Sequence, residues 1–228
     1  RWASCTSGTT RPMAGGKLSI RQAALLLAER DPVIARLVEA DGLPKIAPFP
    51  EGHFAALVRS ITYQQIAGAA ARAIHGRLVA AVDGEVTPER ILALSDETLR
   101  AVGLSHNKAA SVRDLAAKVL DGTVILEPRR LARLSDEEVT ARLSAVRGIG
   151  PWSAQVFELF QLKRPDIWLT GDLGVRQGYG LAWGIPTPTP KQLQPLGDPY
   201  QPYRSVVTWY CWVAARLYGK STASEVAT

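Results

Sequence analysis

The sequence predicts an all-α protein, and three observations support that fold class. Segments rich in Ala and Leu carry apolar residues at the three- to five-residue spacing of a helix face. Helix-capping residues followed by proline or acidic residues recur along the chain. Residues 166–170 are at most a short extended segment, and the sequence shows no longer strand pattern.

The first helices are expected after a polar N-terminal tail. Residues 1–16 are predicted to be this flexible tail, because their Ser- and Thr-rich start has no apolar period. An Ala- and Leu-rich segment predicts a helix over residues 18–29. Asp31-Pro32 predicts an N-cap and the first turn of a second helix over residues 33–39. A proline-broken connection follows over residues 42–50.

The middle of the chain is predicted to consist of helical hairpins. Residues 53–82 carry an apolar helix face that the polar run Tyr63-Gln64-Gln65 interrupts, which predicts two helices with a junction there. Downstream, residues 88–97 are echoed by residues 128–137, and each copy has a proline-started turn, a serine cap and a second helix. Each copy leads to a glycine turn that opens another helix. The alternative to a repeat is that two helix starts converged on the same caps.

The C-terminal part is predicted to be a long loop followed by a closing helix. Residues 178–200 are rich in Pro and Gly and predict mostly loop, with a short helix near residues 190–196. Residues 205–218 combine aromatic, β-branched and Ala residues. They predict a mostly buried helix that ends at Gly219.

Charge and cysteine content limit the classes of function. The formal net charge is +6 and the pI is about 9.5, which favours a polyanionic partner. No apolar run approaches the roughly 18 residues of a transmembrane helix. The chain has two cysteines, Cys5 and Cys211, which are too few for a four-cysteine metal site. A reduced cytosolic protein is the simpler interpretation of these two residues, and a disulfide between them is the alternative. The three histidines do not have metal-ligand spacing.

The glycine turn around residues 146–151 is the first candidate for chemistry. Gly148 and Gly150 allow a tight backbone with positive φ and no Cβ in the way. Unpaired amides at the start of the next helix can then face a phosphate, and Arg147 adds positive charge. Pro151 fits the first helical turn. The alternative is a plain turn between two helices.

Asp172 and several aromatic residues are the other candidates. Asp172 either caps a helix that starts at Leu173 or faces a sugar carbon as an ionised carboxylate. Cleavage of an N-glycosidic bond builds positive charge on the deoxyribose, and a carboxylate can stabilise that charge or activate water. Trp152 follows the glycine turn, and Trp209-Tyr210-Cys211-Trp212 lies near the C-terminus. These rings either stack on a flipped, cationic base or pack in the core.

Five ordered motifs give the chain a specific resemblance over residues 61–216. The chain resembles the helix–hairpin–helix DNA glycosylases, within them the AlkA-type 3-methyladenine DNA glycosylase II branch. The resemblance implies two interleaved helical subdomains, 53–165 and 17–52 plus 166–228, with the active site in the cleft between them. The motifs are Ile61-Thr62-Tyr63-Gln64-Gln65-Ile66, Gly103-Leu104-Ser105-His106-Asn107-Lys108, Arg147-Gly148-Ile149-Gly150-Pro151-Trp152-Ser153-Ala154, Asp172-Leu173-Gly174 and Pro202-Tyr203-Arg204-Ser205.

The resemblance also implies roles for individual residues. Asp172 matches the catalytic aspartate, and the hairpin carbonyls of Val146 and Gly148 match a site that often holds a monovalent cation. Gln65 matches the wedge that fills the gap left by a flipped nucleotide. The predicted base pocket contains Tyr63, Trp152, Val156 and Trp212, and the predicted DNA-binding residues are Gln64, Gln65, Lys108, Arg147, Gly148, Ile149, Gly150 and Ser153.

Three departures from related enzymes refine the prediction. Bifunctional relatives place a lysine nucleophile where this chain has Trp152, so we expect a monofunctional enzyme that leaves an abasic site. Too few residues precede Ile61 for the β-rich N-terminal domain of longer relatives. A further aromatic pocket position is Val156 here, which predicts a roomier pocket.

The predicted function is hydrolysis of alkylated purines, 3-methyladenine and 7-methylguanine, from duplex DNA. We expect a monomer in the bacterial cytoplasm that needs no cofactor, no catalytic metal and no membrane. Two alternatives stay open. One is a glycosylase for neutral bases such as uracil, although no general acid other than Tyr179 or His106 is available beside Asp172. The other is a non-catalytic DNA-binding module, which has no need of that carboxylate.

Overall fold

The structure is a computed structural model that describes residues 18–225. Helices and their connections build this part of the chain, and it contains no strand, so the all-α prediction is confirmed. The elements are α1 (Ile20–Arg30), α2 (Pro32–Asp41), α3 (His53–Tyr63), α4 (Gly68–Ala81), α5 (Pro88–Ala93), α6 (Asp96–Ala101), α7 (His106–Leu120), α8 (Pro128–Leu131), α9 (Asp136–Ser144), α10 (Pro151–Phe160), α11 (Leu173–Trp183), α12 (Pro190–Leu196), the 3₁₀ turn η1 (Asp198–Tyr200) and α13 (Arg204–Glu225).

Several helix starts follow the capping signals of the sequence. Asp31 caps α2, where its carboxylate accepts a 2.7 Å hydrogen bond from the amide of Val33. Ser135 and Glu138 form the predicted capping box of α9. α3 ends at Tyr63, and α4 begins only at Gly68. The predicted break between the two helices is therefore confirmed.

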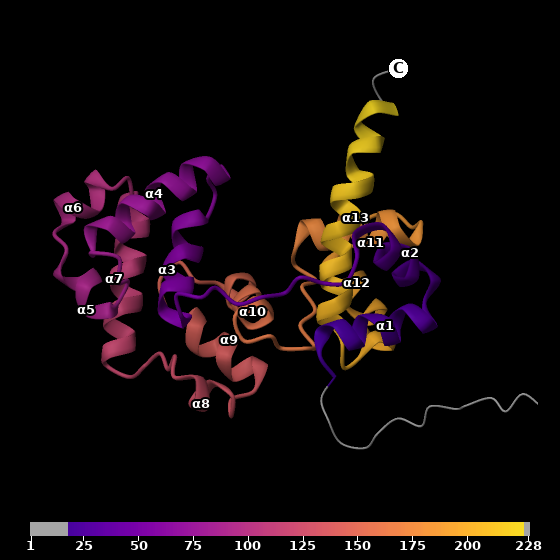
Figure 1. Ribbon diagram of the computed structural model, residues 1–228, viewed down its shortest axis with the longest axis horizontal. Coiled ribbons are helices and arrows are strands. Elements are labelled where there is room, and N and C mark those ends of the chain that lie inside the picture. Colours follow the sequence, from indigo (N-terminus) through magenta and orange to yellow (C-terminus); the bar gives the residue numbers. More distant parts are fainter. Residues whose placement is uncertain (1–17, 226–228) are drawn as a thin grey trace, which may run out of the picture.

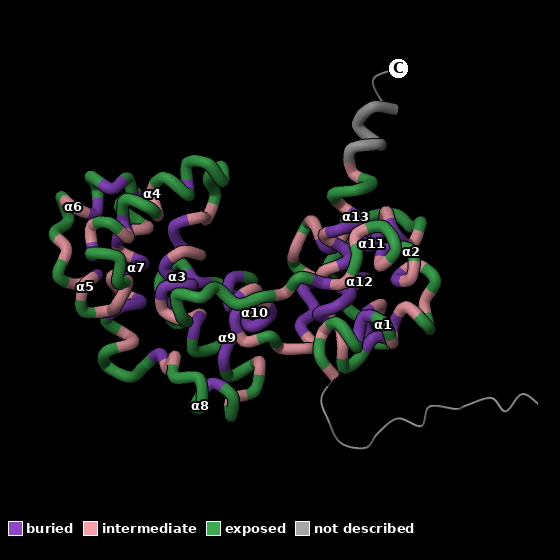
Figure 2. The backbone as a smooth tube through the Cα atoms, viewed as in Figure 1, coloured by how far each residue is buried: buried purple, intermediate pink, exposed green. Residues whose placement is uncertain are grey.

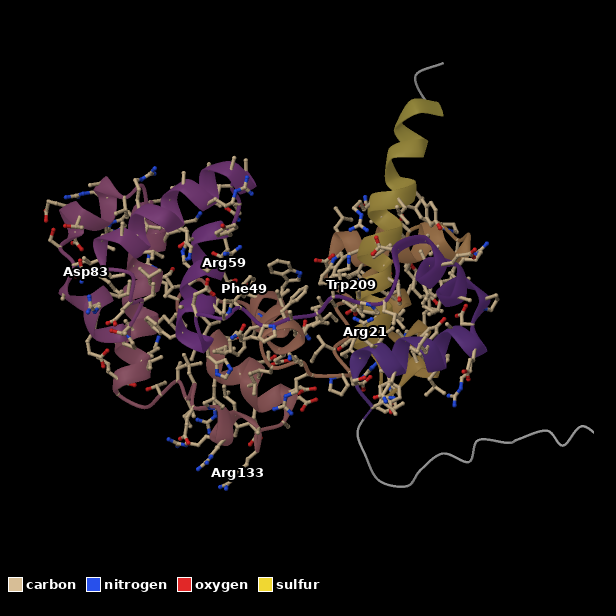
Figure 3. All side chains as sticks on the ribbon, viewed as in Figure 1. Arg21, Phe49, Arg59, Asp83, Arg133 and Trp209 are labelled. Carbon is tan, nitrogen blue, oxygen red and sulfur yellow. The ribbon has the colours of Figure 1, made fainter. Side chains whose placement is uncertain are left out.

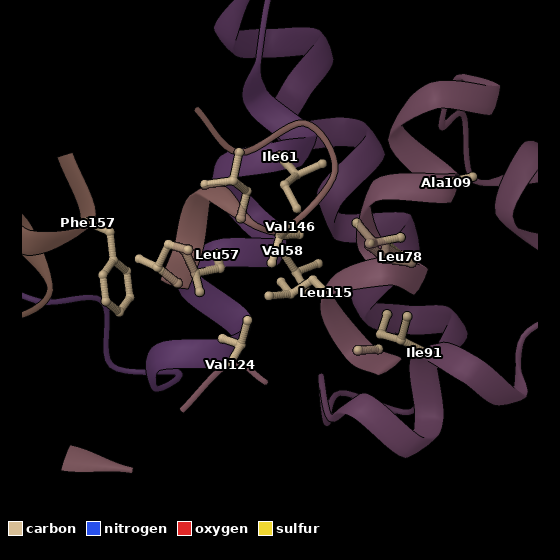
Figure 4. Close-up of a cluster of buried hydrophobic side chains, with 14 of the residues drawn as sticks. Leu57, Val58, Ile61, Leu78, Ile91, Ala109, Leu115, Val124, Val146 and Phe157 are labelled. Carbon is tan, nitrogen blue, oxygen red and sulfur yellow. The ribbon is translucent and has the colours of Figure 1, made fainter. Parts of the chain in front are cut away.

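Two clusters of buried side chains divide the described chain into two lobes (Figures 1 and 2). The hairpin lobe comprises α3–α9, and Figure 4 shows Leu57 and Ile61 of α3 near Leu115 of α7 in its core. The terminal lobe comprises α1, α2 and α11–α13. Helix α10 contributes to both clusters, since Ala154 and Phe157 pack in the first and Leu159 in the second. Both lobes therefore hold helix α10 in place.

The loop prediction for residues 178–200 is wrong over its first part. Residues 178–183 belong to α11, which packs closely against α13. A Cβ on Gly178 would lie 1.7 Å from the carbonyl oxygen of Cys211 in α13. Gly178 therefore reflects the close approach of two helices rather than a break in α11. The closing helix also continues past the predicted end at Gly219, to Glu225.

Three further predictions concern the N-terminal tail, the two cysteines and membrane-spanning helices. The predicted tail, residues 1–16, and Cys5 lie outside the described residues. Cys211 is a free cysteine inside the terminal lobe, and burial raises the pKa of its thiol. None of the described helices has the length and apolar character needed to cross a membrane.

The α11–α13 contact predicts a sharp difference between two glycine substitutions. Gly178→Ala places a methyl group against the Cys211 carbonyl, so it should lower the free energy of unfolding by about 1–3 kcal/mol or more. Gly76→Ala, at a position in α4 with open space around a Cβ, should raise it by about 0.5–1 kcal/mol. Urea denaturation measures both. Equal effects would contradict the proposed packing.

Candidate active site

The carboxylate of Asp172 is the centre of the candidate site. Its Oδ2 accepts a 2.7 Å hydrogen bond from Nε1 of Trp152. Its Oδ1 accepts hydrogen bonds from Nε1 of Trp212 at 3.0 Å and from the amide of Val175 at 2.8 Å. Three N–H donors thus fix the position of the carboxylate.

The three donors come from three helices. Trp152 lies in the first turn of α10, Val175 in the first turn of α11, and Trp212 in the middle of α13. Asp172 is also the N-cap of α11, so the capping interpretation is correct, although it does not exclude a chemical role. Gly174 leaves the necessary room, since a Cβ there would lie 3.2 Å from both Asp172 Oδ1 and Trp212 Cδ1.

The aromatic residues near the C-terminus have separate roles. Trp212 stacks on Phe160, with ring centroids 5.9 Å apart and planes at 11°. Trp209 meets the same ring edge-on. Tyr210 is fully buried and donates a hydrogen bond to the carbonyl of Gly42, which makes it a core residue. Trp152, in contrast, is 47% exposed, so its ring is accessible to a ligand.

The two hairpin glycines differ in their backbone conformation. Gly148 has a φ of +77°, and a Cβ there would lie 2.5 Å from Oγ of Ser111. Gly150 has a φ of −94° and open space where a Cβ would be, so the expectation of a positive φ at Gly150 is wrong. Only Gly148 is required by the turn itself.

The hairpin leaves backbone donors unpaired at the start of α10. No side chain caps this helix. Within the described chain, the amides of Gly148, Gly150, Trp152 and Ser153 donate no hydrogen bond. Such amides at a helix start form an anion-binding site.

Asp114 of α7 fastens the base of the hairpin. Its Oδ2 accepts hydrogen bonds from the Arg147 amide and from Nζ of Lys118, both at 2.7 Å. Burial alone would raise the pKa of this carboxyl, but these two hydrogen bonds hold it below its usual value. The guanidinium of Arg147 donates to Oδ1 of Asn107 at 3.1 Å and stays exposed, so it remains accessible to a phosphate.

The junction between α3 and α4 contacts the hairpin directly. Nε2 of Gln64 donates to the carbonyl of Gly148 at 2.9 Å and lies 3.5 Å from Oγ of Ser153. Gln65 is exposed and has a φ of +55°. Lys108, another predicted DNA-binding residue, donates to the carbonyl of Thr62 at 2.8 Å, and burial lowers the pKa of its ammonium group. Lys108 therefore supports the end of α3.

The two carbonyls predicted to bind a monovalent cation already accept hydrogen bonds. The carbonyl of Val146 accepts from the Ile149 amide at 3.1 Å, and that of Gly148 accepts from Gln64. Each oxygen keeps a second lone pair, which is what a cation would use. Ile149 itself is buried, so its side chain packs beneath the hairpin while its backbone closes the turn.

Two neighbouring cavities open beside these residues. The larger, of about 550 Å³, is lined by the predicted residues Tyr63, Gln64, Gln65, Gly148, Trp152 and Ser153 together with Ser60. The smaller, of about 250 Å³, shares Ser60 and Tyr63 with it and is more apolar. Val156 lines this second cavity, Trp152 lines the larger one, and Trp212 lines neither.

Most residues that line the second cavity were not predicted from the sequence. Phe49, Arg59, Phe160 and Gln161 line it, and they come from the connection between α2 and α3, from α3 and from the end of α10. Gln161 fixes Phe49 with two hydrogen bonds, since its Oε1 accepts from the Phe49 amide at 2.9 Å and its Nε2 donates to the Phe49 carbonyl at 3.2 Å. The one local signal was an aromatic residue between two prolines, Pro48 and Pro50.

The comparisons with known proteins agree with this geometry. A family model described as HhH-GPD superfamily base excision DNA repair protein matches residues 58–200. The chain belongs to this superfamily. DNA-3-methyladenine glycosylase 1 of Schizosaccharomyces pombe is 31% identical over 209 residues, which cover 87% of this chain and 89% of that protein.

Solved HhH-GPD structures share the fold over most of the chain. The S. pombe 3-methyladenine DNA glycosylase in complex with abasic DNA has a TM-score of 0.76 at 30% identity and covers 86% of this chain and 98% of that one. The DNA-3-methyladenine glycosidase of Bacillus halodurans has a TM-score of 0.78 at 31% identity, with 87% and 91% covered. The resemblance predicted from the motifs is therefore confirmed.

In this HhH-GPD chain, a buried carboxyl group lies between the two helices that flank the hairpin. Glu158 of α10 is 1% exposed, and its Oε1 accepts a 2.8 Å hydrogen bond from Oγ1 of Thr140 in α9. Its Oε2 is buried and has no hydrogen-bond partner. Burial raises the pKa of Glu158 to about 7. The ionised form of Glu158 therefore destabilises the packing of α9 against α10.

Glu158 should make the stability of the protein pH-dependent near neutrality. The folded-state pKa of about 7 lies above the ordinary value of 4.5, so the free energy of unfolding should fall as pH rises from 4.5 through 7. The total loss is on the order of 3 kcal/mol. Glu158→Gln should match the wild type near pH 5 and exceed its stability at pH 8, as measured by denaturant unfolding. Glu39→Gln, on the exposed surface of α2, is the control and should leave the pH profile unchanged.

Proposed function

We propose that this protein is a monofunctional DNA glycosylase that removes 3-methyladenine and 7-methylguanine from duplex DNA and leaves an abasic site. The observation that carries the proposal is the Asp172 carboxylate, which two indole groups hold. Trp152 lines the larger cavity, and Trp212 stacks on Phe160, which lines the smaller one. Relatives of similar length are named DNA-3-methyladenine glycosylases, which supports the same substrate class.

The aromatic surroundings of Asp172 suit a cationic base. Trp152 is exposed at the entrance, and Trp212 and Phe160 stack behind it. The faces of such rings attract positive charge, and an alkylated purine carries a positive charge on its ring system. Since a cationic base is already a good leaving group, a modest electrostatic contribution from Asp172 is sufficient for cleavage.

In the proposed mechanism, Asp172 stabilises positive charge on the deoxyribose. The bond between the sugar carbon and the base nitrogen breaks, and its electron pair leaves with the base. A carboxylate close to the sugar lowers the energy of the resulting oxocarbenium-like state, and water adds to the sugar carbon. The proton lost by that water passes to Asp172 or to solvent. Trp152 has no nucleophilic amine, so no covalent enzyme–sugar intermediate forms there.

The hairpin is proposed to bind the DNA backbone. Its four unpaired amides and the exposed guanidinium of Arg147 together form a site for phosphate groups. Gln65, in the exposed junction between α3 and α4, is the proposed wedge. The exposed Ile66 beside it adds an apolar surface at the same junction. Binding should weaken steeply as salt is raised.

Two further parts of the proposal rest on sequence alone. They are a monomeric state and a bacterial cytoplasmic location, the latter from the low cysteine content together with the family resemblance.

Substitution of the aspartate tests the catalytic assignment. Asp172→Asn keeps a good N-cap for α11 but removes the negative charge, so base release should fall by roughly 100-fold or more. Single-turnover release of 3-methyladenine and 7-methylguanine from duplex oligonucleotides measures the effect, with affinity for abasic DNA as the control that should be retained. Undiminished release by the variant would refute the role of Asp172. No release of any base by the wild type would favour a non-catalytic DNA-binding module.

A trapping experiment tests the monofunctional assignment. Borohydride reduces the Schiff base that a lysine nucleophile forms with the sugar, and Trp152 occupies the position where such a lysine would stand. Incubation of the protein with damaged duplex and borohydride should therefore give no covalent protein–DNA adduct on a denaturing gel. A stable adduct would show that another lysine attacks the sugar.

A further inference from the structure

The smaller cavity contains an arginine held between two aromatic rings. The guanidinium carbon of Arg59 lies 4.6 Å from the ring centroid of Phe49 and 4.6 Å from that of Tyr63. Figure 3 labels Phe49 and Arg59 at the inner edge of the hairpin lobe and Trp209 on the facing terminal lobe. Two cation–π contacts fix the plane of the guanidinium, so its N–H groups have a defined direction.

The hydrogen-bond donors of Arg59 are free. The guanidinium is charged at any physiological pH and has five N–H donors. In the described part of the chain, Arg59 makes no ion pair and donates no hydrogen bond, although every other wall of the cavity is largely apolar. Its charge reaches its neighbour His75, whose pKa is lowered first by burial and then by Arg59. The N–H donors of Arg59 are therefore available to a hydrogen-bond acceptor on a ligand.

Two successive contacts connect the cavity to the Asp172 carboxylate. Phe160 lines the cavity and stacks on Trp212, and Nε1 of Trp212 donates to Asp172. On the other side, Tyr63 and Ser60 belong to both this cavity and the larger one that the hairpin and Trp152 line. A nucleotide rotated out of DNA at the hairpin would thus have its sugar near Asp172 and its base directed toward Arg59.

We propose that Arg59 is a specificity-determining residue that recognises the edge of the flipped base and favours a carbonyl oxygen over an amino group at purine position 6. This inference rests on the proposed glycosylase function. Arginine pairs with the O6 and N7 acceptors of hypoxanthine through two N–H groups, and with O6 alone in 7-methylguanine, whose N7 is methylated. A 6-amino group presents N–H donors instead, which leaves the guanidinium donors unpaired in the cavity. The expected order places hypoxanthine above adenine, and 7-methylguanine above 3-methyladenine.

Single-turnover release from four duplexes tests the proposal. The duplexes carry 7-methylguanine, 3-methyladenine, hypoxanthine or undamaged adenine. Arg59→Met removes the donors and the charge but keeps an unbranched side chain between the rings. It should reduce release of hypoxanthine by about 5- to 150-fold relative to 3-methyladenine, and release of 7-methylguanine, which offers only the O6 acceptor, by a smaller factor. Arg59→Lys, which keeps the charge but lacks the planar pair of donors, should lie between Arg59→Met and the wild type.

Controls separate recognition from a merely structural role. Arg30→Met, at the exposed end of α1, should leave every rate unchanged. If Arg59→Met lowers release of all bases by the same factor together with the melting temperature, Arg59 is structural and the proposal is wrong. If the wild type releases 3-methyladenine but the ratios do not change in either variant, the inference fails while the proposed function stands. If the wild type releases no base, the proposed function itself fails, and the inference with it.

Discussion

The hydrogen bonds to the Asp172 carboxylate are the interaction on which the rest of the site depends. One carboxylate joins the start of α11, the hairpin helix α10 and the closing helix α13 through three N–H donors. Because α10 packs in both lobes, this junction also fixes the hairpin relative to the terminal lobe. The Asp172 carboxylate thus caps α11 and at the same time accepts hydrogen bonds from the indoles of Trp152 and Trp212. Its structural role keeps the charge in place, and a charge held in place is what electrostatic catalysis requires.

The two glycine turns, which are either an internal repeat or two converged helix starts, differ in how the helix after each turn is capped. In the first copy, Ser105 caps α7 and accepts a hydrogen bond from the amide of Lys108, so one amide at that helix start has a protein partner. In the second copy, Gly150 and Pro151 replace the capping side chain, and the amides at the start of α10 have no partner in the described chain. The two turns share a helical framework. The absence of a capping side chain at the second turn leaves the Ser153 amide unpaired as well, which supports the proposal that this turn binds phosphate.

Features with a local cause could be predicted from the sequence, and features with a tertiary cause could not. The caps at Asp31 and Ser135, the break after Tyr63 and the hairpin at Gly148 each follow from a few neighbouring residues. Residues 178–183 were predicted as loop because glycine usually interrupts helices, but Gly178 is set by its contact with a carbonyl of α13. The stacking of Arg59 between Phe49 and Tyr63 joins a proline-rich connection to α3, and no local pattern indicates it.

Asp172 and Arg59, the proposed sugar-side and base-side groups, carry opposite charges, and this arrangement matches the electron flow of glycosidic cleavage. As the bond breaks, electrons move from the sugar to the base, so the sugar becomes positive and the base loses positive charge. In the proposed arrangement, Asp172 stabilises the first change and Arg59 favours the second. For a cationic alkylated base, Arg59 raises the energy of the bound substrate, and that repulsion is relieved as the base becomes neutral. An interaction that is less unfavourable in the transition state than in the bound substrate increases the rate of cleavage.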